Sequence, residues 1–234
     1  MGNPLADQQR LTPPTASWPD GTRVWLIDPS LVHNDTLARG VGWLDADEGA
    51  RAARFVRDDD RRLFQVAHLA CRVIVGAALG RRPAEVSWRR APCPACGGPH
   101  GRPVVVGGGV EFSVSHTRGL VAIALAAQPV GVDVEGDPTD AWPDLVGWLH
   151  PNEQREVAAA TDPVVAFGRA WTRHEAHLKA LGIGLGREPS LDHLGAGQQP
   201  VGSPAGFALR DLPTPAGFHG AVVTRRDPGV RPDG

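Results

Sequence analysis

Three short apolar stretches follow one another between residues 110 and 135, and their pattern predicts three β-strands. Long helical patterns lie on either side of them, over 45–79 and 164–181. Shorter strand candidates complete the pattern at 23–27, 86–90, 205–209 and 220–224. Strands and helices thus occur in both halves without regular alternation, which predicts an α+β fold rather than a doubly wound parallel sheet.

The length and charge of the chain exclude several classes of protein. Its 234 residues suffice for one large domain or for two small lobes that share a core. The 24 basic and 26 acidic side chains give a net charge of −2, so we expect no overall electrostatic nucleic-acid binder. No apolar run of about 18 residues and no apolar signal core are visible, and we expect a soluble cytoplasmic protein.

Two acidic residues, Asp133 and Glu135, alternate with valines in the third predicted strand. Residues i and i+2 of a strand project from the same face, so the two carboxylates lie side by side. Such a pair repels itself unless a cation or a proton lies between the carboxylates, and oxygen ligands favour Mg²⁺ over zinc. The alternative is an exposed edge strand with two solvated acids.

The predicted helix over 164–181 carries Glu175 and Lys179 at an i, i+4 spacing. Lys179 is the only lysine of the chain, whose other basic residues are all arginine. An ammonium is a compact point charge, whereas a guanidinium is a planar fork, so this position is a candidate for a specific role. A surface ion pair worth a few tenths of a kcal/mol is the alternative interpretation.

Ser115 and His116 end the first of the three central strands. Hydroxyl and imidazole groups at a strand end are suited to contacts with phosphate oxygens. A serine nucleophile with a histidine base is the competing idea, but neighbouring residues of a strand point to opposite faces. A turn rich in hydroxyl groups with a packed histidine is the third interpretation.

A loop rich in glycine and proline carries Cys93 and Cys96 at the spacing of a zinc half-site, and His100 follows. A structural zinc site needs four ligands, so His68 or another chain would have to supply the fourth. A zinc-binding interaction module is therefore an alternative function. The alternative interpretation is a flexible loop with two reduced thiols.

The order and spacing of these stretches resemble those of the 4′-phosphopantetheinyl transferases, in particular the larger monomeric type that activates peptide and polyketide synthases. The likeness covers about 51–185 and includes a typical G-K/R-P segment, an F-N-x-S-H-S-like run, a G-I/V-D-I/V-E strand and a W-S/T-x-K-E helix. The corresponding segments here are 101–103, 112–117, 131–135 and 171–179.

The resemblance implies a pseudo-twofold pair of similar α+β lobes with coenzyme A bound between them. We place the lobes at 23–128 and 129–224. Their composition predicts a flexible arm over 1–22 and a flexible tail over 225–234.

By position, the resemblance implies that Asp133, Glu135 and Glu175 surround Mg²⁺, with Mn²⁺ as an alternative ion. The reaction implied is attack by a carrier-protein serine on the coenzyme pyrophosphate, with release of 3′,5′-ADP. Glu175 would ligate the metal and act as the base.

The resemblance also implies a set of residues that hold the phosphates of coenzyme A. Arg102, Ser115, His116 and Lys179 match family positions with that role. Lys179 and His116 would in addition supply positive charge during the reaction.

Three basic positions of the family are altered. His174 precedes the glutamate where a lysine is usual, Ile183 replaces another lysine, and Leu63 follows the Asp-Arg-Arg run where an arginine is common. We expect His174 to act as a phosphate-side cation and Arg61 or Arg62 to compensate for the lost charges. A catalytically impaired homologue that binds the carrier or the coenzyme is the alternative.

The implied partner is an apo carrier protein for acyl, peptidyl or polyketide chains, bound by a monomeric enzyme. Such carriers usually present an acidic helix, so an entrance lined by arginine is expected. The candidates for that entrance are Arg118, Arg169 and Arg173.

Overall fold

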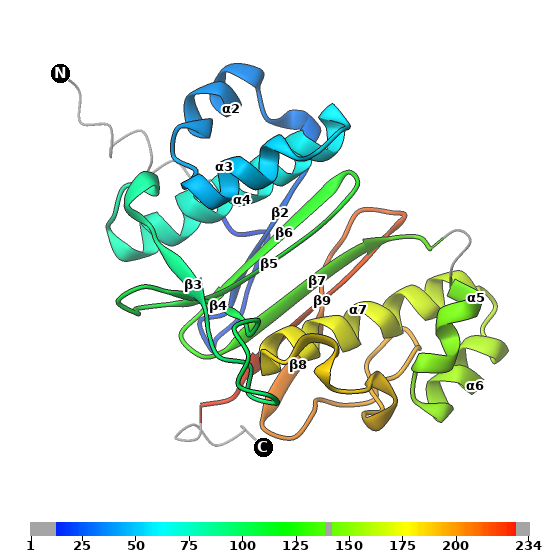
Figure 1. The fold of residues 1–234 in the computed structure, drawn as a ribbon. Helices are drawn as coiled ribbons and strands as arrows, with labels where there is room; N and C mark the ends of the chain where they lie inside the picture. Colours follow the sequence, from blue (N-terminus) through cyan, green and yellow to red (C-terminus); the bar gives the residue numbers. More distant parts are fainter. Residues whose placement is uncertain (1–12, 139–141, 228–234) are drawn as a thin grey trace.

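The computed structural model describes residues 13–138 and 142–227. Figure 1 shows two antiparallel sheets next to each other in the middle of the molecule, each with one long helix packed against it. The combination of helices with antiparallel sheets confirms the α+β class.

The first sheet contains four antiparallel strands in the order β1-β2-β6-β5. Their bounds are β1 (Ala16–Ser17), β2 (Arg23–Ile27), β5 (Glu111–Thr117) and β6 (Leu120–Ala126). Because β1 pairs with the start of β2, residues 16–17 belong to the sheet, although an arm was predicted over 1–22. Residues 1–12 of that arm lie outside the described part.

Three helices accompany the first sheet, namely α2 (Asn34–Val41), α3 (Ala46–Ala53) and α4 (Asp58–Leu79). The helical pattern predicted over 45–79 is therefore split by residues 54–57 into α3 and α4. A capping box of Asp45 and Glu48 starts α3, and Gly80 ends α4 in the left-handed conformation.

Helix α4 has 22 residues and, in the described part of the chain, is the one helix long and apolar enough to cross a membrane. Half of its apolar window is buried, with Ile74 and Val75 packed against the first sheet. The buried Arg72 of the same helix donates to Glu48 and to the carbonyl of Val86. The apolar face of α4 therefore belongs to the core of the protein.

The second sheet contains β7 (Val130–Gly136), β9 (Phe218–Arg225) and β8 (Phe207–Asp211), in that order. Helix α7 (Pro163–Leu181) covers it, and α5 (Trp142–Leu145) and α6 (Pro151–Ala159) lie near one end of α7. Since β9 extends to Arg225, the predicted tail begins within a strand, and 228–234 lie outside the described residues.

The two sheets share a buried apolar cluster. Val130, Val132 and Val134 of β7 pack there with alanines of β6, including Ala122 and Ala124. The predicted lobes are thus joined by one core, as the short length of the chain requires. Their boundaries and their twofold relation stay predictions.

A separate pair of short strands, β3 (Trp88–Arg90) and β4 (Pro103–Val105), flanks the cysteine-containing loop. The two strands are antiparallel and pair over three residues each. The loop between them is therefore anchored at both ends.

Candidate active site

The acidic face of β7 lies beside β5. Asp133 and Glu135 occupy this face, whereas Val132 and Val134 enter the shared core, which confirms the predicted alternation. Ser115 of β5 donates a hydrogen bond of 2.8 Å from its Oγ to Oδ1 of Asp133. Ser113, two residues earlier, accepts from the amide of Val132 and so fixes the two strands side by side.

Helix α7 can lie directly on β7 because Gly131 has no side chain. A Cβ at this position would be 2.0 Å from the carbonyl oxygen of Ala176 and 2.4 Å from the amide nitrogen of Ala180. The same close approach places Glu175 and Lys179 against the acidic face of the strand. The glycine of the motif therefore sets the distance between the helical and the strand carboxylates.

Lys179 links the helix to both strands. Its Nζ lies 2.6 Å from Oδ1 of Asp133 and donates to Oγ of Ser115 over 3.0 Å. The other carboxylate oxygen of Asp133, Oδ2, is buried and has no hydrogen-bond partner among the described residues. A buried carboxylate oxygen without a partner is costly, so this atom marks a position for a ligand.

Two carboxyl groups of the site have raised pKa values. Burial and the neighbouring charge of Asp133 raise the pKa of Glu135 to about 7, although Thr117 and Lys179 act in the opposite direction. Burial and Asp133 also raise the pKa of Glu175, against the effect of Lys179. The carboxylates therefore repel one another, and a cation bound between them would stabilise their ionised forms.

These side chains line one cavity of about 370 Å³. Six of its lining residues were predicted from the sequence: Ser115, His116, Asp133, Glu135, Glu175 and Lys179. The convergence of a strand pair and a distant helix on this cavity is the arrangement expected of a site that binds a charged ligand.

The donor set of the cavity fits a hard divalent cation. Asp133, Glu135 and Glu175 offer only oxygen ligands, and Oδ2 of Asp133 is free to bind. Mg²⁺ prefers such oxygen ligands and usually keeps several waters, which the open cavity allows. The three carboxylates are thus the residues of the cavity that would hold the ion, and their side chains would have to draw together around it, because among the described residues only Cys93, Cys96 and His100 already have their ligand atoms within 4.8 Å of one another.

The raised pKa of Glu135 predicts how the protein responds to pH without metal. The pKa of Glu135 is about 7 in the folded protein and has its ordinary value of 4.5 in the unfolded chain. The folded protein therefore holds this proton more tightly, and the free energy of unfolding falls as the pH rises from 4.5 to about 7. Glu135→Gln should therefore raise the free energy of unfolding at about pH 8 by about 1–2 kcal/mol, after allowance for partial solvent screening.

Denaturant unfolding in chelator at about pH 8 and about pH 4 measures this effect. We expect the gain to vanish at the lower pH, where both side chains are neutral, and saturating Mg²⁺ to favour the wild type instead. An equal gain at both pH values would show that the carboxylate is not destabilised by its surroundings.

Comparison with known proteins finds similarity over the part of the chain that contains β7 and α7. The family model described as 4′-phosphopantetheinyl transferase superfamily matches residues 129–222, which contain β7 and α7. A Nostoc sp. protein named 4′-phosphopantetheinyl transferase HetI is 30% identical over 182 residues, with 74% of this chain and 73% of that protein covered. The chain belongs to the 4′-phosphopantetheinyl transferase superfamily.

Two further relatives are matched over smaller shares of their length. A Schizosaccharomyces pombe protein named L-aminoadipate-semialdehyde dehydrogenase-phosphopantetheinyl transferase is 31% identical over 163 residues, or 62% of either chain. A Thraustochytrium sp. protein named phosphopantetheinyl transferase is 27% identical over 173 residues, with 66% of this chain and 58% of that protein covered. The matched part thus spans less than two thirds of these two relatives.

Three arginines predicted to serve the coenzyme do not line this cavity of the phosphopantetheinyl transferase homologue, and their role stays a prediction. Arg61 pairs with Asp58, and Arg62 donates to Asn34. Arg102 is also absent from the lining and forms an ion pair with Glu111. Long arginine side chains reach whichever acceptor the packed fold presents, and sequence spacing does not determine that acceptor.

Three other basic or titratable residues line the cavity, namely Arg51, His68 and Arg90. Arg51 begins the stretch of family resemblance, which is the one signal in the sequence that pointed to it. His68 pairs with Glu48 through a contact of 2.7 Å, and Arg90 donates to the carbonyl of Gly101. Arg51 of α3 and Arg90 of β3 thus add permanent positive charge to the lining of the cavity.

His116 is exposed at the rim of the cavity. Partial removal of its ring from water, together with the nearby His68, Lys179 and Arg51, holds its pKa below the ordinary value of 6.5. At neutral pH the ring is therefore uncharged and offers a single N–H donor. The positive charge expected of His116 during the reaction stays a prediction.

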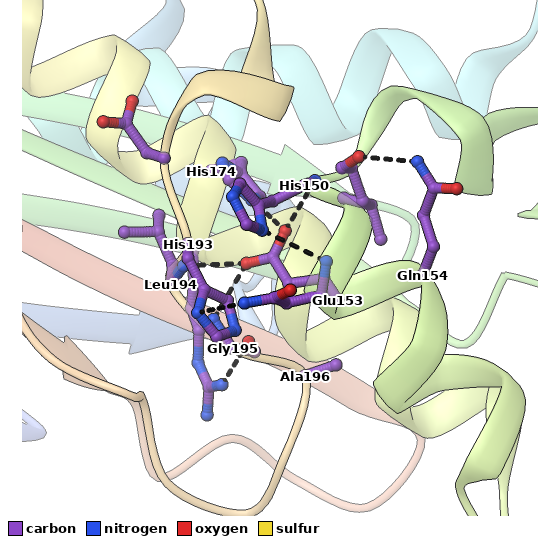
Figure 2. A network of polar contacts seen from close by, with 12 residues as sticks. His150, Glu153, Gln154, His174, His193, Leu194, Gly195 and Ala196 are labelled. Atoms are coloured by element: carbon purple, nitrogen blue, oxygen red, sulfur yellow. Dashed lines mark hydrogen bonds and ion pairs between the residues drawn. The ribbon is translucent and has the colours of Figure 1, made fainter.

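His174 does not face the cavity, although a phosphate-side role was expected. Figure 2 shows its ring pointing to Glu153 of α6, and the two side chains are 2.7 Å apart in a fully buried contact. The second carboxylate oxygen of Glu153 accepts from the amides of Leu194 and Gly195. His174 thus joins α7 to α6 and to the 194–195 backbone, on the side away from Glu175.

Arg173 is likewise not part of an entrance. It is 0% exposed and forms a two-bond ion pair with Asp211, and it also donates to the carbonyls of Gly195 and Gly197. Arg173 thus joins α7 to β8 and to the backbone of residues 195–197. The other two arginines proposed for the entrance remain predictions.

Proposed function

We propose that this chain transfers the 4′-phosphopantetheine arm of coenzyme A to a serine hydroxyl of an apo carrier protein. The observation that supports this function most is the cavity that Asp133, Glu135 and Glu175 line together with Lys179, where the buried oxygen Oδ2 of Asp133 has no partner among the described residues. Three carboxylates and one lysine are suited to a metal-bound diphosphate.

Each side chain has a role in the proposed reaction. The serine hydroxyl of the carrier attacks the phosphorus that bears pantetheine, its proton passes to Glu175 directly or through a water, and the bond to 3′,5′-ADP breaks. The raised pKa of Glu175 suits a group that accepts a proton near neutral pH. Mg²⁺ held by the three carboxylates would neutralise charge on the diphosphate.

The hydrogen-bond donors of the site would hold the phosphates. Lys179 and Ser115 already lie within hydrogen-bond distance of each other and of Asp133, so they are positioned before substrate arrives. Neutral His116 would donate one hydrogen bond at the rim, while Arg51 and Arg90 supply permanent positive charge. Preorganised donors of this kind stabilise a transition state without reorganisation.

We also propose the larger, monomeric type for this transferase, because each sheet with its long helix is present in one chain and both meet at the site. A cytoplasmic location and carriers of peptide, polyketide or fatty-acid synthesis complete the proposal. The replacement of a family lysine by His174 takes no charge from the lining of the cavity, because the His174 side chain is buried against Glu153.

Mass spectrometry of an apo carrier protein tests the function directly. Incubation with the chain, coenzyme A and Mg²⁺ is expected to add one phosphopantetheine arm per carrier, and chelator should prevent it. If acyl, peptidyl and polyketide carriers all stay unmodified while coenzyme A still binds, the chain is a non-catalytic homologue and the proposal is wrong.

A further inference from the structure

The loop between β3 and β4 brings two thiols and one imidazole together, away from the carboxylate site. The ligand atoms of Cys93, Cys96 and His100 all lie within 4.8 Å of one another, and Sγ of Cys96 is 3.0 Å from Nε2 of His100. Ligand atoms around a tetrahedral zinc ion are separated by about 3.5–3.8 Å, from metal bonds of about 2.0–2.3 Å. The three groups therefore need only small shifts to share one ion.

Backbone hydrogen bonds close a tight turn that begins at Cys93. The amide of Cys93 donates to the carbonyl of Gly98, and the amide of Gly97 donates back to the carbonyl of Cys93, both over 2.7 Å. Gly97 has a φ of +73°, which a glycine adopts without strain. These bonds turn the chain tightly, so that both cysteine side chains face the same point.

Backbone donors surround the sulfur of Cys93, because the amides of Ala95 and Cys96 both point at it. Such donors are suited to a thiolate, which is the form that binds metal. Cys93 is buried, whereas Cys96 and His100 are exposed. Neither cysteine is in a disulfide.

We propose that Cys93, Cys96 and His100 bind one Zn²⁺ ion, with water in the fourth position. Thiolate and imidazole ligands select zinc over Mg²⁺, so this site and the carboxylate site would hold different metals. His68, which the sequence suggested as a fourth ligand, instead pairs with Glu48 and lines the other cavity. Among the described residues the metal-binding group contains only the three side chains.

The position of the loop indicates what the ion does. Gly101, next to His100, accepts a hydrogen bond from Arg90, which lines the carboxylate cavity. A Cβ at Gly182, the residue that ends α7, would lie 3.5 Å from the side chain of Arg102. An ion that stiffens this loop therefore steadies Arg90 and the contact with the end of α7.

Metal analysis of the purified 234-residue chain tests the site without any transfer assay. We expect about one zinc ion per chain, and after removal of zinc a cobalt titration should give a thiolate-to-cobalt charge-transfer band that saturates at one equivalent. Cys93→Ser and Cys96→Ser should each weaken cobalt binding by at least about 100-fold, and His100→Ala by at least about 10-fold.

Cys71 provides the matched control, because it is buried in the core of α4, outside the loop. Cys71→Ala should keep the zinc content and the cobalt band of the wild type. Absence of both zinc and the band in the wild type, a Cys93–Cys96 disulfide in their place, or a band that survives both serine substitutions would each overturn the proposal. None of these outcomes depends on whether the chain transfers phosphopantetheine.

Discussion

Asp133→Ala and Glu175→Gln are each expected to lower the rate of pantetheinyl transfer by about 10³-fold or more while the fold is retained. Asp133 carries the unpartnered oxygen Oδ2 and is 2% exposed, so its loss removes the most enclosed metal ligand. Glu175→Gln keeps the shape of the side chain but removes both a ligand charge and the proposed base. Single-turnover transfer to an apo carrier measures both effects.

The fold controls separate chemistry from stability. Both variants should keep the circular dichroism spectrum of the wild type, because Asp133→Ala leaves Lys179 partly exposed to water and Glu175→Gln relieves repulsion. Glu188→Gln removes an exposed carboxylate outside the cavity and should leave the rate unchanged. A wild-type rate in either site variant would refute the assignment of the carboxylates.

Gly131→Ala is expected to destabilise the chain by about 3 kcal/mol or more, or to prevent folding. The added methyl group would meet the backbone of α7 at 2.0 Å and 2.4 Å, and backbone atoms cannot move aside as a flexible side chain can. Helix α7 would have to lift off β7, which would also separate Glu175 from Asp133. Denaturant unfolding measures the loss as a lower midpoint.

Gly49→Ala is the matched control for this substitution. Gly49 lies within α3, and a Cβ there would have no atom within 4 Å. Alanine should therefore stabilise the chain by about 0.5–1 kcal/mol through its higher helix propensity. A midpoint of Gly131→Ala equal to that of the wild type would mean that α7 does not contact β7 as described.

Much of the fold and four of the ten residues that line the cavity were predictable from periodicity. The period of two in β7 indicates that Asp133 and Glu135 share a face, and the structure confirms it. The helical spacing in α7 predicts that Glu175 and Lys179 are neighbours, and both line the cavity. Such local patterns are reliable because backbone geometry sets the direction of each side chain within its own element.

The partners of the arginine side chains could not be predicted from such local patterns. Arg61 and Arg62 follow one another in α4, yet they bind Asp58 and Asn34, while Arg51 of α3 reaches the cavity instead. A long guanidinium side chain can reach several acceptors, and its partner depends on which loops pack beside the helix. Sequence spacing contains no information about that packing.

The sequence alone thus determined the elements, the carboxylate pair on its strand, and the glutamate and lysine on their helix, because each depends on the geometry of a single element. Only the tertiary structure decided that the close contact at Gly131 unites these groups, that His174 turns to Glu153, and that Arg173 is buried. These facts depend on contacts between segments far apart in the chain. Their distances and partners are set when the two sheets and their helices pack together.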